Sequence, residues 1–199
     1  MSAFLPKPTV ELVRELGTQF DSDHNTALIE YTLARLVGQF PRNEDIRDVL
    51  LKVTTINALY STNIYAVVAL SEHISQLKID SLLASGDPEA VELVARVRFK
   101  GDSKERHNYS FASKYCSWHN QAAFPIYDSR ARSNLWRYKK QDRFHNFSSN
   151  DVWCYNGYRT FRQIVSVFRS HYGLDEMNFK EIDKFLYWFD PKGNYNSAP

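Results

Sequence analysis

The spacing of apolar residues is the feature that most limits how this chain can fold. In residues 29–40 and again in 46–56, apolar side chains recur every three or four positions. Side chains at that spacing lie on one face of an α-helix, whereas a half-buried strand alternates every second residue. The pattern therefore predicts two amphipathic helices in the first third of the chain.

The helical pattern continues along most of the chain, with turn signals between the helices. Gly86-Asp87-Pro88-Glu89 is expected to end one helix and start the next, and Asp80 to cap a short helix over 81–85. The alternating run 95–100 is taken to continue a helical stripe, and the polar segment 99–108 is expected to form a loop. Further helices are expected over 63–77, 109–118, 129–138, 158–172 and 179–189, which makes the fold class all-α.

Length and composition predict one compact domain over residues 1–191, followed by a flexible tail at 192–199. A chain of 199 residues with 43% hydrophobic residues can fill a core of its own. Its two cysteines, Cys116 and Cys154, are too few for a disulfide framework, so we expect reduced thiols and a cytoplasmic protein. No leader or membrane-length apolar stretch is recognisable, so no membrane association is expected.

Positive charge is concentrated in the middle of the chain. Residues 96–143 contain 12 lysines and arginines against 4 acids, a net charge of 12 − 4 = +8, whereas residues 1–95 carry 7 − 13 = −6. Such a basic strip is typical of contacts with a phosphate backbone, although a solvated basic surface without a partner gives the same pattern. The candidate DNA-binding residues are Lys100, Lys104, Arg106, Lys114, Arg130, Arg132, Lys139 and Lys140.

Common cofactor, metal and nucleophile motifs are missing from the sequence. It has no glycine-rich phosphate loop, no paired Cys-x-x-Cys and no His-Glu-x-x-His, so no cofactor and no metal ion are expected. Cys116 and His119 share a helical face and could form a nucleophile–base pair. Their aromatic neighbours Tyr115 and Trp118 favour core packing instead.

The segment Ser110 to Arg130 resembles the catalytic core of the helix-hairpin-helix DNA glycosylase superfamily. In that superfamily a helix of small residues leads into Pro-Val-Asp-Thr-His-Val, and here Pro125-Ile-Tyr-Asp128-Ser-Arg130 is similar, with one extra residue after proline. Upstream, Asn57-Ala-Leu-Tyr-Ser-Thr-Asn-Ile64 resembles the family segment that lines the base pocket. The resemblance implies a compact helical glycosylase-like fold, in one or two lobes flanking a DNA-binding groove, with Asp128 as the catalytic carboxylate.

The chain departs from the superfamily at two places. The glycine-rich hairpin that binds a phosphate is replaced by the basic loop around Gly101, so DNA is expected to be gripped differently. The position of the Schiff-base lysine falls on Ser110, so no lyase step is expected. Lys114, one helical turn later, could substitute for that lysine or could be an ordinary member of the basic strip.

The chemistry of glycosylases suggests roles for several residues. A fixed carboxylate such as Asp128 can stabilise the oxocarbenium-like sugar or activate water, although aspartate before a helix is also a common N-cap. A flipped base must be held by aromatic or amide groups, and the candidates, all of which could instead be core residues, are Asn57, Tyr60, Asn63, Tyr65 and Trp118.

A closer likeness indicates a substrate. Asn57-Ala-Leu-Tyr-Ser-Thr, Ser85-Gly-Asp-Pro-Glu and Phe111-Ala-Ser-Lys-Tyr-Cys-Ser-Trp-His-Asn resemble a bacterial glycosylase group linked to anti-phage defence. That resemblance implies excision of glucosylated hydroxymethylcytosine from double-stranded phage DNA. The competing interpretation is a non-catalytic helical domain that binds DNA or another protein.

Overall fold

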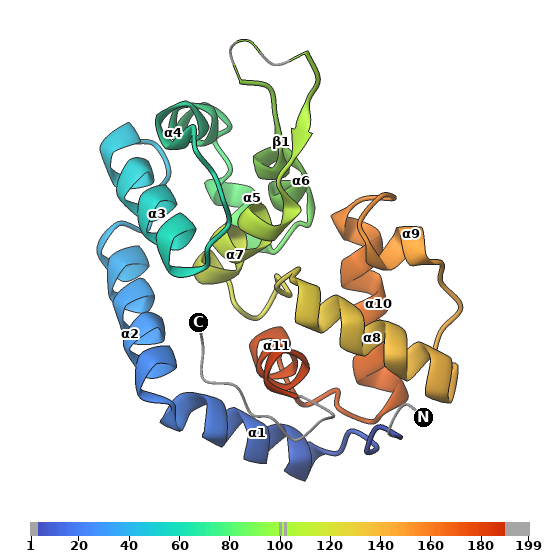
Figure 1. Ribbon diagram of the computed structural model, residues 1–199. Helices are drawn as coiled ribbons and strands as arrows, with labels where there is room; N and C mark the ends of the chain where they lie inside the picture. The colour runs from blue at the N-terminus through green and yellow to red at the C-terminus, as the bar shows by residue number, and fades with distance from the viewer. Residues whose placement is uncertain (1–3, 100, 102, 190–199) are drawn as a thin grey trace. The chain divides into compact units, whose positions relative to one another are not determined.

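The computed structural model describes residues 4–99, 101 and 103–189, and these form an all-α fold, as the sequence predicts (Figure 1). The helices are α1 (Val10–Ser22), α2 (His24–Gln39), α3 (Ile46–Leu59), α4 (Val67–Gln76), α5 (Asp80–Ser85), α6 (Glu89–Ala95), α7 (Tyr109–His119), α8 (Ser129–Asp142), α9 (Ser149–Val152), α10 (Tyr158–His171) and α11 (Phe179–Trp188). Two short strands, β1 (Arg96–Val97) and β2 (Arg106–His107), complete the described chain.

The chain divides into two compact units. Unit 1 consists of Met1–Leu28 and Pro125–Pro199, and unit 2 consists of Ile29–Phe124. The expectation of a single domain over residues 1–191 stays a prediction, and the tail expected at 192–199 lies outside the described residues. In the part of the chain that the structure describes, no helix is long and apolar enough to cross a membrane.

Unit 1 is built on an aromatic core contributed by α8, α10 and α11. The Tyr138 ring of α8 lies 5.3 Å from the ring of Phe168 in α10 and 6.3 Å from the ring of Phe185 in α11. Helix α1 packs on α11, where the Phe20 ring meets the edge of Trp188 at a centroid distance of 5.6 Å. The Tyr138–Phe168 and Phe20–Trp188 pairs are edge-to-face, a geometry that adds to the stabilisation from burying large apolar surfaces.

In unit 2, helix α3 packs against α4, and α6 packs against α7. The apolar stripe predicted for α3 is confirmed at Val49, Val53 and Ile56, which are fully buried, whereas Ile46 at the start of the helix is 40% exposed. Gly86, after α5, has φ +71°, and a Cβ there would lie 2.6 Å from Cβ of Ala123. Only glycine fits both requirements, so the predicted stop between α5 and α6 is confirmed.

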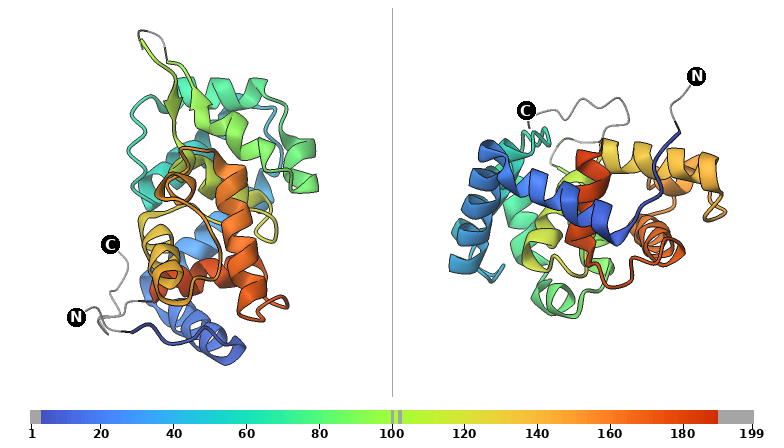
Figure 2. Two further views of the ribbon diagram at one scale, coloured as in Figure 1. Left: turned by 90° about the vertical axis from the view of Figure 1, so that its right-hand side faces the viewer. Right: turned by 90° about the horizontal axis from the view of Figure 1, so that it is seen from below.

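The prediction for residues 95–100 was wrong. Helix α6 ends at Ala95, and β1 pairs antiparallel with β2, Arg96 opposite His107 and Val97 opposite Arg106 (Figures 1 and 2). The exposed–buried alternation of Arg96 and Val97 is that of a strand, which is what a period of two indicates. The expected loop 99–108 accordingly includes β2 near its end.

Two helix starts also differ from the prediction. Helix α4 begins at Val67 rather than at residue 63, because Ser61 and Asn63 have φ of 48° and 59° and so cannot continue a right-handed helix. Asp80 lies inside the first turn of α5 rather than before it. Its carboxylate accepts from the Nδ2 of Asn43 at 2.6 Å instead of capping α5.

Candidate functional site

Asp128 immediately precedes helix α8 of unit 1. Its backbone is extended (φ −136°, ψ 172°), and its Oδ1 accepts from the amide of Ala131 at 2.7 Å, so the N-cap predicted from the sequence is confirmed. Among the described residues, none donates to the second carboxylate oxygen, Oδ2. The half-buried side chain thus has one oxygen fixed by the helix and one oxygen available to another group.

The loop that carries Asp128 is anchored to helices α10 and α11 of unit 1. The amide of Ile126 donates to Oδ2 of Asp183 in α11 at 2.7 Å, and the carbonyl of Pro125 accepts from the hydroxyl of Tyr158 in α10 at 2.8 Å. Both contacts are buried, where a hydrogen bond is costly to break. The chain just before Asp128 is therefore held by α10 and α11, and Asp128 itself is bonded to the start of α8.

Arg132, one turn into α8, is held by the segment around Asp128. Its Nε donates to the carbonyl of Asp128 at 3.2 Å, and its Nη1 donates to the hydroxyl of Tyr127 at 2.8 Å. The guanidinium carbon lies 4.0 Å from the ring centroid of Trp153 and 4.8 Å from that of Tyr127. Burial raises the pKa of Tyr127 to about 12, so its hydroxyl keeps its proton and donates to the carbonyl of Trp153 at 2.8 Å.

The other predicted DNA-binding residues of α8 also contact aromatic rings. The Arg130 guanidinium carbon lies 4.5 Å from the ring centroid of Tyr187. Lys139 and Lys140 lie 4.8 Å and 5.6 Å from the ring centroid of Trp136, and Lys139 also donates to the carbonyl of Phe147. Aromatic faces attract cations, so these contacts hold the positive charges at defined places along the helix.

The remaining predicted DNA-binding residues belong to unit 2. Lys104 and Arg106 are exposed in and beside the β1–β2 hairpin, and Arg106 lies over the ring of Phe99 at 5.3 Å. Lys100 lies outside the described residues. Lys114 is only 5% exposed, and its Nζ donates to Oγ of Ser110 at 2.8 Å, so it is not a surface lysine.

Asn57, the first candidate for the base pocket, is used inside unit 2. Its Nδ2 donates to the carbonyl of Ile64 at 2.9 Å, and its Oδ1 accepts from the amide of Ile64 and from the hydroxyl of Thr62. These bonds close the loop between α3 and α4. Asn57 therefore has a clear structural role, and its role in a base pocket stays a prediction.

Two other pocket candidates of unit 2 are in direct contact. The indole Nε1 of Trp118 donates to the hydroxyl of Tyr60 at 3.1 Å, and Nζ of Lys114 lies 5.5 Å from the centroid of the Tyr60 ring. Asn63 and Tyr65 are exposed on the loop before α4. The structure thus groups Tyr60, Trp118 and Lys114, while Asn63 and Tyr65 lie on the surface of that loop.

A buried polar network in unit 2 was missed by the sequence analysis. Lys52, which is fully buried, donates through Nζ to the carbonyls of Phe40 and Arg42 and to Oδ1 of Asn43 at 2.7–2.9 Å. Burial lowers the pKa of Lys52 to about 8. A lysine inside an otherwise apolar helical stripe was the available signal, because such a side chain must find polar partners.

The alternative Cys116–His119 pair has the wrong chemistry for a nucleophile and its base. Cys116 is fully buried, and burial raises the pKa of its thiol, which disfavours the reactive thiolate. Burial and the nearby Lys52 lower the pKa of His119 to about 3, and its Nε2 lies 3.4 Å from Nζ of Lys52. Core packing, favoured from the sequence, accounts for both residues.

No group of three or more histidines, cysteines or acids placed to hold a metal ion occurs among residues 4–99, 101 and 103–189. The polar side chains around Asp128 are instead hydrogen-bond donors and cations, which suit an anionic or polar ligand.

Comparison with known proteins gives a family but no activity. Residues 12–123 match the HI_0787_N family, which is described as an N-terminal domain. An uncharacterized protein of Haemophilus influenzae is 39% identical over 143 residues, which are 71% of this chain and 66% of that protein. The chain thus spans about two thirds of the length of this relative. No solved structure matches it. Because the match covers more than half of its residues, the chain belongs to the HI_0787_N family.

Proposed function

We propose that this protein is a monofunctional DNA glycosylase with Asp128 as its catalytic carboxylate. The observation that carries the proposal is the state of that carboxylate, with Oδ1 bound to the amide of Ala131 and Oδ2 without a donor among the described residues. An aspartate that only caps a helix needs the hydrogen bond to the helix amide and no other contacts. Here the preceding loop is anchored by Asp183 and Tyr158, and cations follow along α8.

The proposed reaction is hydrolysis of the N-glycosidic bond. The bond between the base and the sugar breaks, positive charge develops on the sugar ring, and the ionised Asp128 stabilises that charge. Asp128 then accepts a proton from the water whose oxygen bonds to the anomeric carbon, and the departing base takes up a proton from solvent. The products are the free base and an abasic site.

Neither a lyase step nor a cofactor belongs to the proposal. A lyase needs an amine that attacks the sugar as a free base. The family position of that amine is Ser110 in this chain, and Lys114, one helical turn later, uses its Nζ to donate to the Oγ and the carbonyl of Ser110. Hydrolysis by a carboxylate and water requires no metal ion or organic cofactor.

The proposed substrate is double-stranded phage DNA with modified bases, in particular glucosylated hydroxymethylcytosine, acted on in the cytoplasm as part of anti-phage defence. This part rests on the likeness of the segments at 57–62, 85–89 and 111–120 to a bacterial glycosylase group. The basic, aromatic surface of α8 supports a nucleic acid as the ligand.

Incubation with DNA tests the proposal. Phage DNA carrying glucosylated hydroxymethylcytosine and unmodified DNA of the same sequence are treated with the protein and then with alkali, which breaks strands at abasic sites. We expect breaks in the modified DNA and their loss in Asp128→Asn, while Tyr31→Ala, an exposed residue of α2, serves as the matched control. Intact DNA in every reaction would contradict the glycosylase.

A second candidate is a non-catalytic DNA-binding domain. The observation that favours it is the use of Asp128 as an N-cap, which is sufficient to explain an aspartate at this position. This candidate predicts DNA binding that is unchanged in Asp128→Asn and no strand breaks in any substrate. The alkali experiment therefore separates the two.

A further inference from the structure

Unit 1 presents two exposed aromatic rings on the turn that follows α9. Trp153 and Tyr155 are 46% and 79% exposed. The two residues flank Cys154, which is buried and has a φ of 56°. Such a backbone conformation is uncommon for a residue other than glycine. The turn therefore holds two large rings at the surface while its middle residue anchors it.

The Trp153 ring is held in place from one side. The Arg132 guanidinium carbon lies 4.0 Å from its ring centroid, and the carbonyl of Trp153 accepts from the hydroxyl of Tyr127. Arg132 is itself bound to the carbonyl of Asp128 and to Tyr127. Across residues 4–99, 101 and 103–189, no other cation and no aromatic ring stacks on this indole. A fixed ring loses little conformational entropy when a ligand stacks on it.

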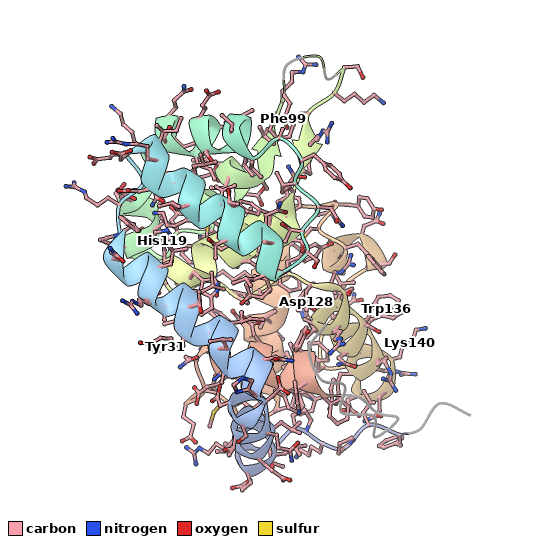
Figure 3. All side chains as sticks on the ribbon, turned by 60° about the vertical axis from the view of Figure 1, so that its left-hand side comes forward. Tyr31, Phe99, His119, Asp128, Trp136 and Lys140 are labelled. Carbon is pink, nitrogen blue, oxygen red and sulfur yellow. The ribbon has the colours of Figure 1, made fainter. Side chains whose placement is uncertain are left out.

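Cations and one more indole continue from this point along α8. Trp136 follows Arg132 by four positions, and Lys139 and Lys140 follow Trp136 by three and four, so these side chains lie on one side of the helix. Figure 3 shows Asp128, Trp136 and Lys140 following one another along α8. Residues 129–142 contain five lysines and arginines and one acid, a net charge of 5 − 1 = +4, and that acid, Asp142, accepts from the hydroxyl of Tyr172.

We propose that this α8–α9 surface, formed by Arg132, Trp136, Lys140, Trp153 and Tyr155, binds unpaired nucleotides. A base stacks on the indole of Trp153, and the sugar–phosphate backbone follows the cations of α8 toward Lys140. The inference rests on the proposed function for the identity of the polymer, DNA. It adds that the strand is unpaired where it meets the surface.

The combination of rings and charges favours an unpaired strand over a duplex. Lysines and arginines alone bind the phosphates of either form. An exposed ring gains by stacking only when a base face is accessible, and in a duplex the base faces are already stacked on each other. Every base has such a face, so we expect little dependence on sequence. The surface lies beside Asp128, where an extruded nucleotide would have to arrive.

Binding measurements on unmodified DNA test this inference without requiring catalysis. The full chain is titrated into fluorescein-labelled oligo(dT) and into a labelled duplex of the same length, with fluorescence anisotropy read at several salt concentrations. We expect Trp153→Ala to weaken binding to oligo(dT) by about tenfold or more and to change duplex binding by less than about twofold. Trp153→Phe, which keeps a ring, should retain most of the affinity, and Tyr31→Ala should bind as the wild type does.

Lys140→Ala gives an independent readout of the backbone contact. Loss of one phosphate contact should reduce the slope of log affinity against log salt by about 0.7 for the single strand. Circular dichroism melting confirms that each variant is folded. Because Trp153→Phe preserves the packing of the ring on Arg132, it remains informative if Trp153→Ala is destabilised.

Two results would overturn the inference. One is an affinity for oligo(dT) that is the same in Trp153→Ala and in the wild type. The other is an equal loss for oligo(dT) and for the duplex. The alkali assay tests the proposed function separately, so failure of the stacking surface and failure of the glycosylase can be distinguished. Strand breaks with normal binding by Trp153→Ala would refute only the stacking surface, and loss of binding without strand breaks in any DNA would refute only the glycosylase.

Discussion

Asp128 has two roles that a graded set of substitutions can separate, one as the N-cap of α8 and one as the proposed catalytic carboxylate. Asparagine and serine cap helices about as well as aspartate, and alanine does not. Neither asparagine nor serine can carry the negative charge that the reaction needs. The variants Asp128→Asn, Asp128→Ser and Asp128→Ala therefore change stability and catalysis in different orders.

The magnitudes follow from the single hydrogen bond between Oδ1 and the amide of Ala131. Asn and Ser keep that bond and lose only the favourable charge at a helix N-terminus, about 0.5 kcal/mol. Alanine loses the bond as well, so its free energy of unfolding falls by about 1.5 kcal/mol in total. For a chain of this size we expect Tm to fall by about 1–2 °C for Asn and Ser and by about 3–6 °C for Ala.

Catalysis should not follow that order. All three variants should lose about 100-fold or more in the rate of abasic-site formation, because a positioned acid–base group contributes roughly 10² to 10⁴. Single-turnover alkali cleavage of the modified DNA gives the rate, and calorimetry gives Tm. If activity falls only in Asp128→Ala, in proportion to its stability, then Asp128 is a helix cap and the catalytic assignment is refuted.

Three further predictions concern unit 2. Burial lowers the pKa of His119 from its ordinary value of 6.5 to about 3, so the stability from the neutral ring is complete above pH 6.5 and is lost as pH falls toward 3. Between pH 6.5 and pH 5 this loss amounts to about 2 kcal/mol. The free energy of unfolding in urea should therefore fall less over this pH range in His119→Gln than in the wild type. Parallel pH profiles for the two proteins would contradict this prediction. Asn57→Ala breaks three hydrogen bonds of the α3–α4 loop and should lower the free energy of unfolding by about 2 kcal/mol, whereas an unchanged Tm would mean that the loop holds without them. Borohydride added during turnover should trap no covalent protein–DNA complex, because the family position of the Schiff-base lysine is Ser110 and the Nζ of Lys114 donates to that serine. A trapped complex that disappears in Lys114→Gln would reverse this assignment.

Elements with a long apolar stripe or a strong terminal signal could be predicted from the sequence. The N-cap at Asp128 and the glycine stop at Gly86 are examples, because each depends on residues next to it in the chain. The β1–β2 pair could not be predicted in the same way. Its two strands have two residues each and depend on pairing across an eight-residue separation, which leaves only a short alternation around Val97 as a signal.

In the candidate site too, features that depend on neighbouring residues could be predicted, and contacts with residues further along the chain could not. The identity of Asp128 as a capping carboxylate came from local sequence, but the partners of Asn57 did not. Asn57 was selected for a base pocket on a resemblance, whereas its amide bonds Ile64 and Thr62 seven and five residues later. Lys52 was not selected at all. Its place in the apolar stripe of α3 indicates burial, but two of its acceptors are main-chain carbonyls, which every residue possesses and no sequence pattern marks.

Counting charges along the sequence also overstates how many cations can meet a phosphate. Residues 96–143 carry a net charge of +8, and eight of their cations are candidate DNA contacts. In the structure Lys114 is bound to Ser110, Arg132 to Asp128 and Tyr127, and Lys139 to the carbonyl of Phe147. Such cations also shape the surface of the protein, since some of their donors are already bonded to acceptors of the chain. The positive charge of α8 therefore acts partly through the rings it holds, and Trp153, absent from the sequence-based candidates, becomes the residue through which Arg132 would act on a nucleic acid.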